Sequence, residues 1–137
     1  MIRDFGKLTA GQEIWVKIED HSNAARRLNA NNIEEWIYKG EITKLGRKYV
    51  TVKFGRYEDG KINYFHEEKF NVEDDYRQVW TAGGADYKLY LTKQDILDEI
   101  ESGKLYDQIK SEFSGYKNKG RFTLDKLRMI KEIIEES

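Results

Sequence analysis

The first half of the chain alternates hydrophobic and polar residues, with the period of two that is typical of β-strands with one buried face. After Gly11, the side chains of Ile14, Val16 and Ile18 fall on one side of the chain and those of the intervening residues on the other. This pattern predicts a half-buried strand. The polar stretch that follows, residues 21–32, is expected to be a long loop.

A first turn signal lies at Gly46, between a segment rich in strand formers (residues 34–45) and an alternating segment (residues 48–54). Val50, Val52 and Phe54 share one face of the second segment. We therefore expect a β-hairpin that turns at Gly46.

A second turn signal is the pair Asp59 and Gly60, which joins this hairpin to a third strand over residues 61–70. In that strand Ile62, Tyr64 and Phe70 have the same parity and are expected on one face. Two shorter strands are predicted at residues 76–80 and 87–91. Five or six short strands with tight turns favour a small barrel or a sandwich.

From residue 92 the hydrophobic period becomes helical. Thr92 is a plausible N-cap, Gly103 is expected to break or bend the helix that follows, and Thr123 is expected to cap a last helix. Each helical segment carries an apolar stripe, which we interpret as core. The stripes are Ile96, Leu97 and Ile100, then Leu105, Ile109 and Phe113, and finally Leu124, Leu127, Ile130 and Ile134.

The predicted fold class is α+β, with a small antiparallel β-barrel of five or six strands followed by a C-terminal segment of two or three helices. Residues 1–91 form the predicted barrel. Residues 92–137 form a helical tail, which we expect to pack on the barrel as part of one structural domain.

The amino-acid composition excludes several classes of function. Charged residues make up 36% of the chain, above the roughly 25% typical of soluble domains. They nearly cancel, with 24 basic against 25 acidic residues, so no global field favours nucleic acid or membrane. The absence of cysteine excludes disulfides and thiolate zinc sites. No apolar run suits a signal peptide or a membrane span, so a cytoplasmic location in a bacterial host is expected.

Two parts of the chain resemble known families. Residues 8–16 together with residues 42–52 resemble SH3-like small barrels. Residues 90–100, Phe113 and residues 123–130 resemble the small "β-barrel domain" proteins of bacteriophages and mobile elements in Gram-positive bacteria. That family has no agreed activity and supplies no site residues. The resemblance implies a setting in which DNA, replication or recombination machinery and host defence systems are common partners, and in which small proteins include anti-CRISPR inhibitors.

Catalytic chemistry finds little support. Only His21 and His66 could serve as histidine bases, and neither lies in a recognisable triad context. We expect no enzymatic activity, no metal site and no cofactor. A minor alternative is a metal-dependent nuclease site built from Asp59, Glu67 and Lys69, since an acid followed by Glu-x-Lys on a strand is the skeleton of such a site.

The distribution of charge is more informative than its sum. Residues 21–33, 42–57 and 113–124 contain basic residues and no acid, and the first two stretches could share one face of a small barrel. Lysine and arginine neutralise phosphates, and interleaved tyrosines can stack on bases. The alternative is that these residues only solvate the surface. The candidate residues for binding a partner or nucleic acid are Arg26, Arg27, Lys44, Arg47, Lys48, Lys53, Arg56 and Tyr57.

Two hypotheses about function follow. In the first, the chain is a non-enzymatic phage or mobile-element binding protein, and a candidate inhibitor of a host nucleic-acid-targeting defence system such as a CRISPR effector. Its partner would be a protein or a protein–nucleic-acid complex. The contact residues in this case would include Trp36, Tyr38, Tyr57, Trp80 and the acidic run 73–75. In the second, the chain is a small-barrel module that binds DNA or RNA directly through the hairpin at residues 42–57.

Overall fold

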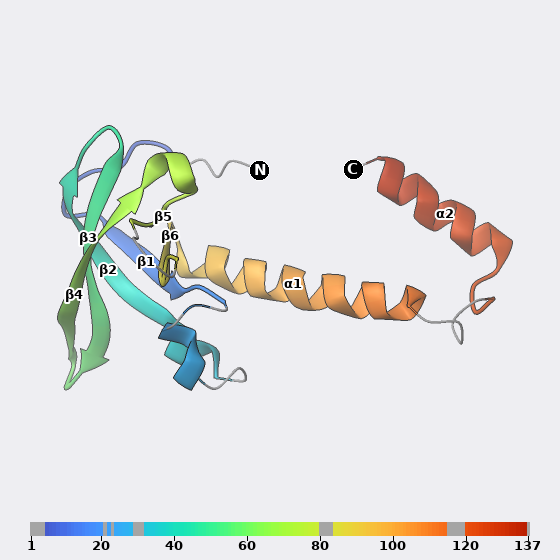
Figure 1. Ribbon diagram of the computed structural model, residues 1–137, viewed down its shortest axis with the longest axis horizontal. Coiled ribbons are helices and arrows are strands. Elements are labelled where there is room, and N and C mark those ends of the chain that lie inside the picture. Colours follow the sequence, from blue (N-terminus) through green and yellow to red (C-terminus); the bar gives the residue numbers. More distant parts are fainter. Residues whose placement is uncertain are drawn as a thin grey trace. The chain divides into compact units, whose positions relative to one another are not determined.

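The computed structural model describes residues 5–20, 22, 24–28, 32–79, 84–114 and 120–136 (Figure 1). Its strands are β1 (Glu13–Ile18), β2 (Ile37–Leu45), β3 (Tyr49–Glu58), β4 (Lys61–Asn71), β5 (Arg77–Gln78) and β6 (Tyr87–Tyr90). Its 3-10 turns are η1 (Ala24–Arg27), η2 (Ile33–Trp36) and η3 (Val72–Asp74). Its helices are α1 (Lys93–Phe113) and α2 (Leu124–Glu135).

The six strands form a closed antiparallel barrel in which each strand pairs with the next in the sequence. Closure comes from β1 and β6, whose register places Val16 opposite Leu89. The predicted α+β fold, a small antiparallel barrel followed by helices, is confirmed. None of the helices in the described ranges is long and apolar enough to cross a membrane.

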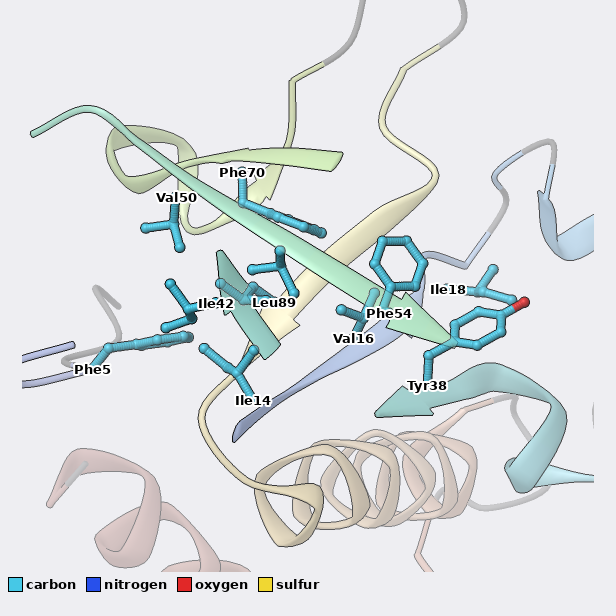
Figure 2. Packing of buried hydrophobic residues seen from close by; sticks show 11 residues of the cluster. Phe5, Ile14, Val16, Ile18, Tyr38, Ile42, Val50, Phe54, Phe70 and Leu89 are labelled. Carbon is cyan, nitrogen blue, oxygen red and sulfur yellow. The ribbon is translucent and has the colours of Figure 1, made fainter. Parts of the chain in front are cut away.

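The barrel core consists of the inward-facing residues that the alternation predicts. Ile14, Val16 and Ile18 of β1 are at most 2% exposed. The residues labelled in Figure 2 come from β1, β2, β3, β4 and β6, and Phe5 lies at one side of the cluster. Phe54 is fully buried, and its ring lies 5.2 Å from that of His66 and 5.0 Å from that of Tyr87. The partial burial of Tyr87 itself raises the pKa of its hydroxyl to about 12.

A β-bulge at Phe65 changes the faces of β4. Phe54 pairs with His66 and Gly55 pairs with Tyr64, so Phe65 has no opposite residue on β3. Tyr64 therefore lies on the outside, where the Lys53 ammonium stands 4.7 Å from its ring centroid, whereas Phe70 is fully buried. The expectation that Tyr64 and Phe70 share one face is wrong, because one extra residue reverses the alternation.

Several strand boundaries differ from those expected. The strand predicted at residues 34–45 begins at Ile37, because residues 33–36 form η2. The loop predicted at residues 21–32 contains η1. The strand predicted at residues 76–80 shortens to β5, since Tyr76 adopts a left-handed backbone with φ of 58° that cannot continue a strand. Trp80 lies outside the described residues.

Both predicted helix caps are present. The Thr92 hydroxyl accepts a hydrogen bond from the Asp95 amide at 3.1 Å, and Thr123 accepts one from the Lys126 amide at 3.3 Å. Of the break or bend expected at Gly103, the break is wrong, because α1 runs through this residue to Phe113.

The chain divides into two compact units, Met1–Leu97 and Asp98–Ser137. In the second unit the rings of Phe113 and Phe122 stack at 5.1 Å, and Arg121 forms an ion pair with Glu112. The predicted division at residue 91, with the tail packed on the barrel, stays a prediction.

Candidate functional site

The turn between β2 and β3 carries a cluster of exposed cations. The Gly46 amide closes the turn by donating to the Tyr49 carbonyl at 2.9 Å, and Lys44, Arg47 and Lys48 are exposed around it. The Lys48 carbonyl accepts a hydrogen bond from the Val72 amide at 2.9 Å, which ties the turn to the end of β4. The backbone that presents these three side chains is therefore held at two points.

Lys69 of β4 joins this cluster through the strand register. Thr51 of β3 pairs with Lys44 on one side and with Lys69 on the other. Neighbouring strands lie about 4.8 Å apart, so the two lysines stand roughly 10 Å apart on the same face. We call Lys44, Arg47, Lys48 and Lys69 the basic tip.

The basic tip has no acidic partners in the part of the chain that the structure describes: no ion pair there involves any of its four cations. The Lys48 ammonium lies 5.5 Å from the Tyr49 ring centroid. Tyr49 is itself 37% exposed. The tip thus combines free positive charge with one accessible aromatic ring.

The other predicted residues of the hairpin are engaged within the barrel. Lys53 forms an ion pair with Glu41 at 3.0 Å, and this hydrogen bond raises the pKa of Lys53. Arg56 donates to the carbonyls of Glu34 and Glu35, and its guanidinium lies 4.3 Å from the Tyr38 ring. It therefore caps η2, a structural role.

Tyr57 is 62% exposed, and its hydroxyl accepts a hydrogen bond from the Lys39 ammonium at 2.9 Å. The same ammonium forms an ion pair with Glu13 at 3.1 Å. Tyr57 is accessible, but the cation beside it is already neutralised.

Arg26 and Arg27 do not join the basic tip. They lie on η1, which follows the end of β1, whereas the tip follows the end of β2. Because these strands are antiparallel, the two groups lie at opposite ends of the barrel (Figure 1), roughly 30 Å apart along the nine residues of β2. The single basic face expected from residues 21–33 and 42–57 is not formed.

The nuclease alternative does not assemble. Asp59 lies in the β3–β4 turn with φ of 52°, whereas Glu67 and Lys69 lie toward the other end of β4. Eight residues of strand separate Asp59 from Glu67, on the order of 26 Å. Among the described residues, no three histidine or acidic side chains are grouped so as to hold a metal ion.

A shallow recess of about 300 Å³ lies beside Lys69 on the outside of the barrel. It is lined by Thr51, Glu67, Glu68, Lys69 and Val79.

The residues predicted for a protein partner are only partly accessible. Trp36 packs against the core and Tyr38 is buried. Within the acidic run 73–75, Asp74 forms an ion pair with Arg77 at 3.5 Å and Asp75 forms one with Lys88 at 3.1 Å. Glu73 is exposed.

Comparison with known proteins identifies one family. The family described as Phage ProQ C-terminal-like domain matches residues 1–137, the whole chain. No curated protein and no solved structure matches the sequence. The match confirms the predicted relation to a family of small phage-associated domains.

Proposed function

We propose that this chain, which belongs to the Phage ProQ C-terminal-like domain family, is a phage-associated binding protein that contacts nucleic acid through its basic tip. The observation that carries the proposal is the group of four exposed cations without acidic partners in the described chain, in and beside a turn held by the Gly46 and Val72 amides. We propose no catalytic role.

The chemistry of the tip fits a phosphate backbone. Lysine and arginine that neutralise phosphates release condensed counterions, and this release dominates affinity at low salt. The chain as a whole has a net charge of −1, so long-range attraction is weak and contact is expected to be local. Four phosphate contacts would give a slope of log K against log salt of roughly −3 to −4.

We expect the double substitution Arg47→Glu with Lys48→Glu to abolish this binding. The change removes two exposed cations from the tip and adds two anions, so phosphates would be repelled. Fluorescence anisotropy with labelled single- and double-stranded DNA and RNA, measured over a series of salt concentrations, tests this. Wild-type protein should bind at low salt with the slope given above.

The matched control is Arg128→Glu with Lys131→Glu on α2, which makes the same change in net charge at two exposed positions. This control should bind as the wild type does. The proposal is wrong if wild-type protein binds none of the four probes at low salt, or if the two double variants lose affinity equally.

A second candidate function is inhibition of a host nucleic-acid-targeting system such as a CRISPR effector. The phage family favours it, and the exposed Tyr57 and Glu73 offer aromatic and acidic contacts to a protein. Here we expect the chain to co-purify with the effector and to reduce its target cleavage. Loss of both effects in Tyr57→Ala would show that the effector binds the surface around Tyr57. If the wild-type protein forms no complex and does not inhibit cleavage, this function is excluded for the effector tested.

Three further expectations from the sequence are also proposals. They are that the barrel is related to SH3-like barrels, that the protein comes from Gram-positive bacteria, and that it is located in the cytoplasm.

A further inference from the structure

Three lysine–tyrosine pairs lie on the outside of the barrel, along β3. The Lys48 ammonium lies 5.5 Å from the Tyr49 ring, Lys53 lies 4.7 Å from Tyr64, and Lys39 lies 5.3 Å from Tyr57. We call the outward-facing residues of β2, β3 and β4 the outer face; they include Lys39, Glu41, Lys44, Tyr49, Thr51, Lys53, Tyr57, Tyr64 and Lys69.

The pairs are regularly spaced. Tyr49, Lys53 and Tyr57 follow one another at intervals of four residues on β3, so all three point outward. At about 3.3 Å per residue, each interval measures about 13 Å and the row measures about 26 Å. It begins at the basic tip and ends at the β3–β4 hairpin, which gives a linear track and not a compact patch.

From this row we infer that the ligand is a single-stranded nucleic acid that runs along β3, with bases stacked on Tyr49 and Tyr64 and phosphates at the basic tip. The inference rests on the nucleic-acid contact proposed above and adds the form of the ligand. A track of this length suits the range of about 4 to 16 nucleotides that single-strand-binding barrels occupy.

The exposed aromatic rings favour a single-stranded ligand over a double-stranded one. In a duplex the base faces are covered by their neighbours, so rings on a strand surface can stack only on unpaired bases. The lysines do not block this stacking, because an exposed cation–π contact is weaker than a stacked base and the long side chain can move to a phosphate.

The acidic residues along the outer face also favour a single strand. Glu41 of this face pairs with Lys53, Glu67 lies opposite Lys53 on β4, and Glu13 of the adjacent strand β1 pairs with Lys39. Beyond the basic tip the track therefore has little net positive charge. A rigid duplex would meet these acids without the compensation of stacking, whereas a single strand gains that compensation at each ring.

The test compares oligonucleotides of roughly 12 nucleotides as single strands and as the matching duplex, by anisotropy over a series of salt concentrations. We expect wild-type protein to bind the single strand at least about 10-fold more tightly. Tyr49→Ala and Tyr64→Ala should each weaken single-strand binding roughly 5- to 100-fold and leave duplex binding and the salt slope unchanged.

Two controls keep the result interpretable. Tyr49→Phe and Tyr64→Phe preserve the ring and should bind as the wild type does, which separates stacking from any loss of hydroxyl hydrogen bonds. Tyr106→Ala removes a tyrosine of α1 that is 67% exposed and should have no effect.

If the tip variant Arg47→Glu with Lys48→Glu loses binding but the tyrosine variants do not, or if the duplex binds as tightly as the single strand, the proposed nucleic-acid contact stands and the single-strand inference is wrong. If neither form binds, the proposed contact itself is wrong.

Discussion

Replacement of Gly55 by alanine is expected to destabilise the barrel by about 3 kcal/mol, at the upper end of the cost of overpacking. A Cβ atom at this position would lie 1.7 Å from the Asn63 carbonyl oxygen and 2.7 Å from its carbonyl carbon. Both are backbone atoms of the paired strand, so no side-chain rotation can relieve the clash. Thermal unfolding followed by tryptophan fluorescence should show a midpoint lower by roughly 12 to 24 °C.

Gly103→Ala is the matched control, because nothing lies within 4 Å of its Cβ position. Alanine is a better helix former than glycine by about 1 kcal/mol, so this variant should gain helix stability, seen as an increase in far-ultraviolet circular dichroism. An unchanged unfolding midpoint for Gly55→Ala would show that β3 and β4 do not approach each other at the bulge as described.

Phe54→Ala is expected to have an effect of similar size, about 3 to 5 kcal/mol. The Phe54 ring is fully buried and makes contacts with four other rings, those of Tyr38, His66, Phe70 and Tyr87. Removal of the ring leaves a cavity in the middle of the barrel that a closed set of strands cannot collapse to fill. Chemical denaturation should show a lower midpoint with a similar slope.

Phe65→Ala provides the comparison on the neighbouring strand. Phe65 is 47% exposed and contacts Tyr38 and His66 from the edge of the same aromatic group. Because nearly half of its surface is already in contact with water, we expect a loss of about 1 kcal/mol, well below that of Phe54→Ala. Equal losses for Phe54→Ala and Phe65→Ala would contradict the arrangement of the core.

The parts of the fold that the sequence predicts well are those in which local chemistry and burial agree. Val50, Val52 and Phe54 alternate because one face of β3 is buried and the other meets solvent. The turn at Asp59 and Gly60 could be recognised because both residues tolerate positive φ, and both adopt it, at 52° and 78°.

Lys69 could not be placed from the sequence, because its position depends on the bulge. Counted from the Asp59–Gly60 turn without a bulge, Thr51 would pair with Glu68 and the outer face would carry an acid there. The extra residue at Phe65 shifts the register by one, so Thr51 pairs with Lys69 and the fourth cation joins the basic tip. No periodic signal reveals a bulge within a strand whose residues alternate between exposed and half-buried as far as Phe70.

The exclusion of Lys53 and Arg56 from the tip also required the structure. Both lie in an acid-free stretch, and their partners come from other segments: Glu41 is on β2, and the carbonyls that Arg56 binds belong to η2. At Gly103, in contrast, the local signal was given too much weight. A helix penalty of about 1 kcal/mol is too small to interrupt α1 where its other residues favour the helix.

The shortest strand determines where the barrel is weakest. Among the described residues, β5 and β6 share the pair of Arg77 with Lys88 and a hydrogen bond from the Leu89 amide to the Tyr76 carbonyl, whereas ten pairs join β3 to β4. Local opening begins where few backbone hydrogen bonds must break, so we expect the ring of strands to open first at β5. An opened ring has two edges, β4 and β6, whose unpaired amides and carbonyls can accept a strand from another chain. We therefore expect conditions that weaken β5 to favour self-association through these two edges.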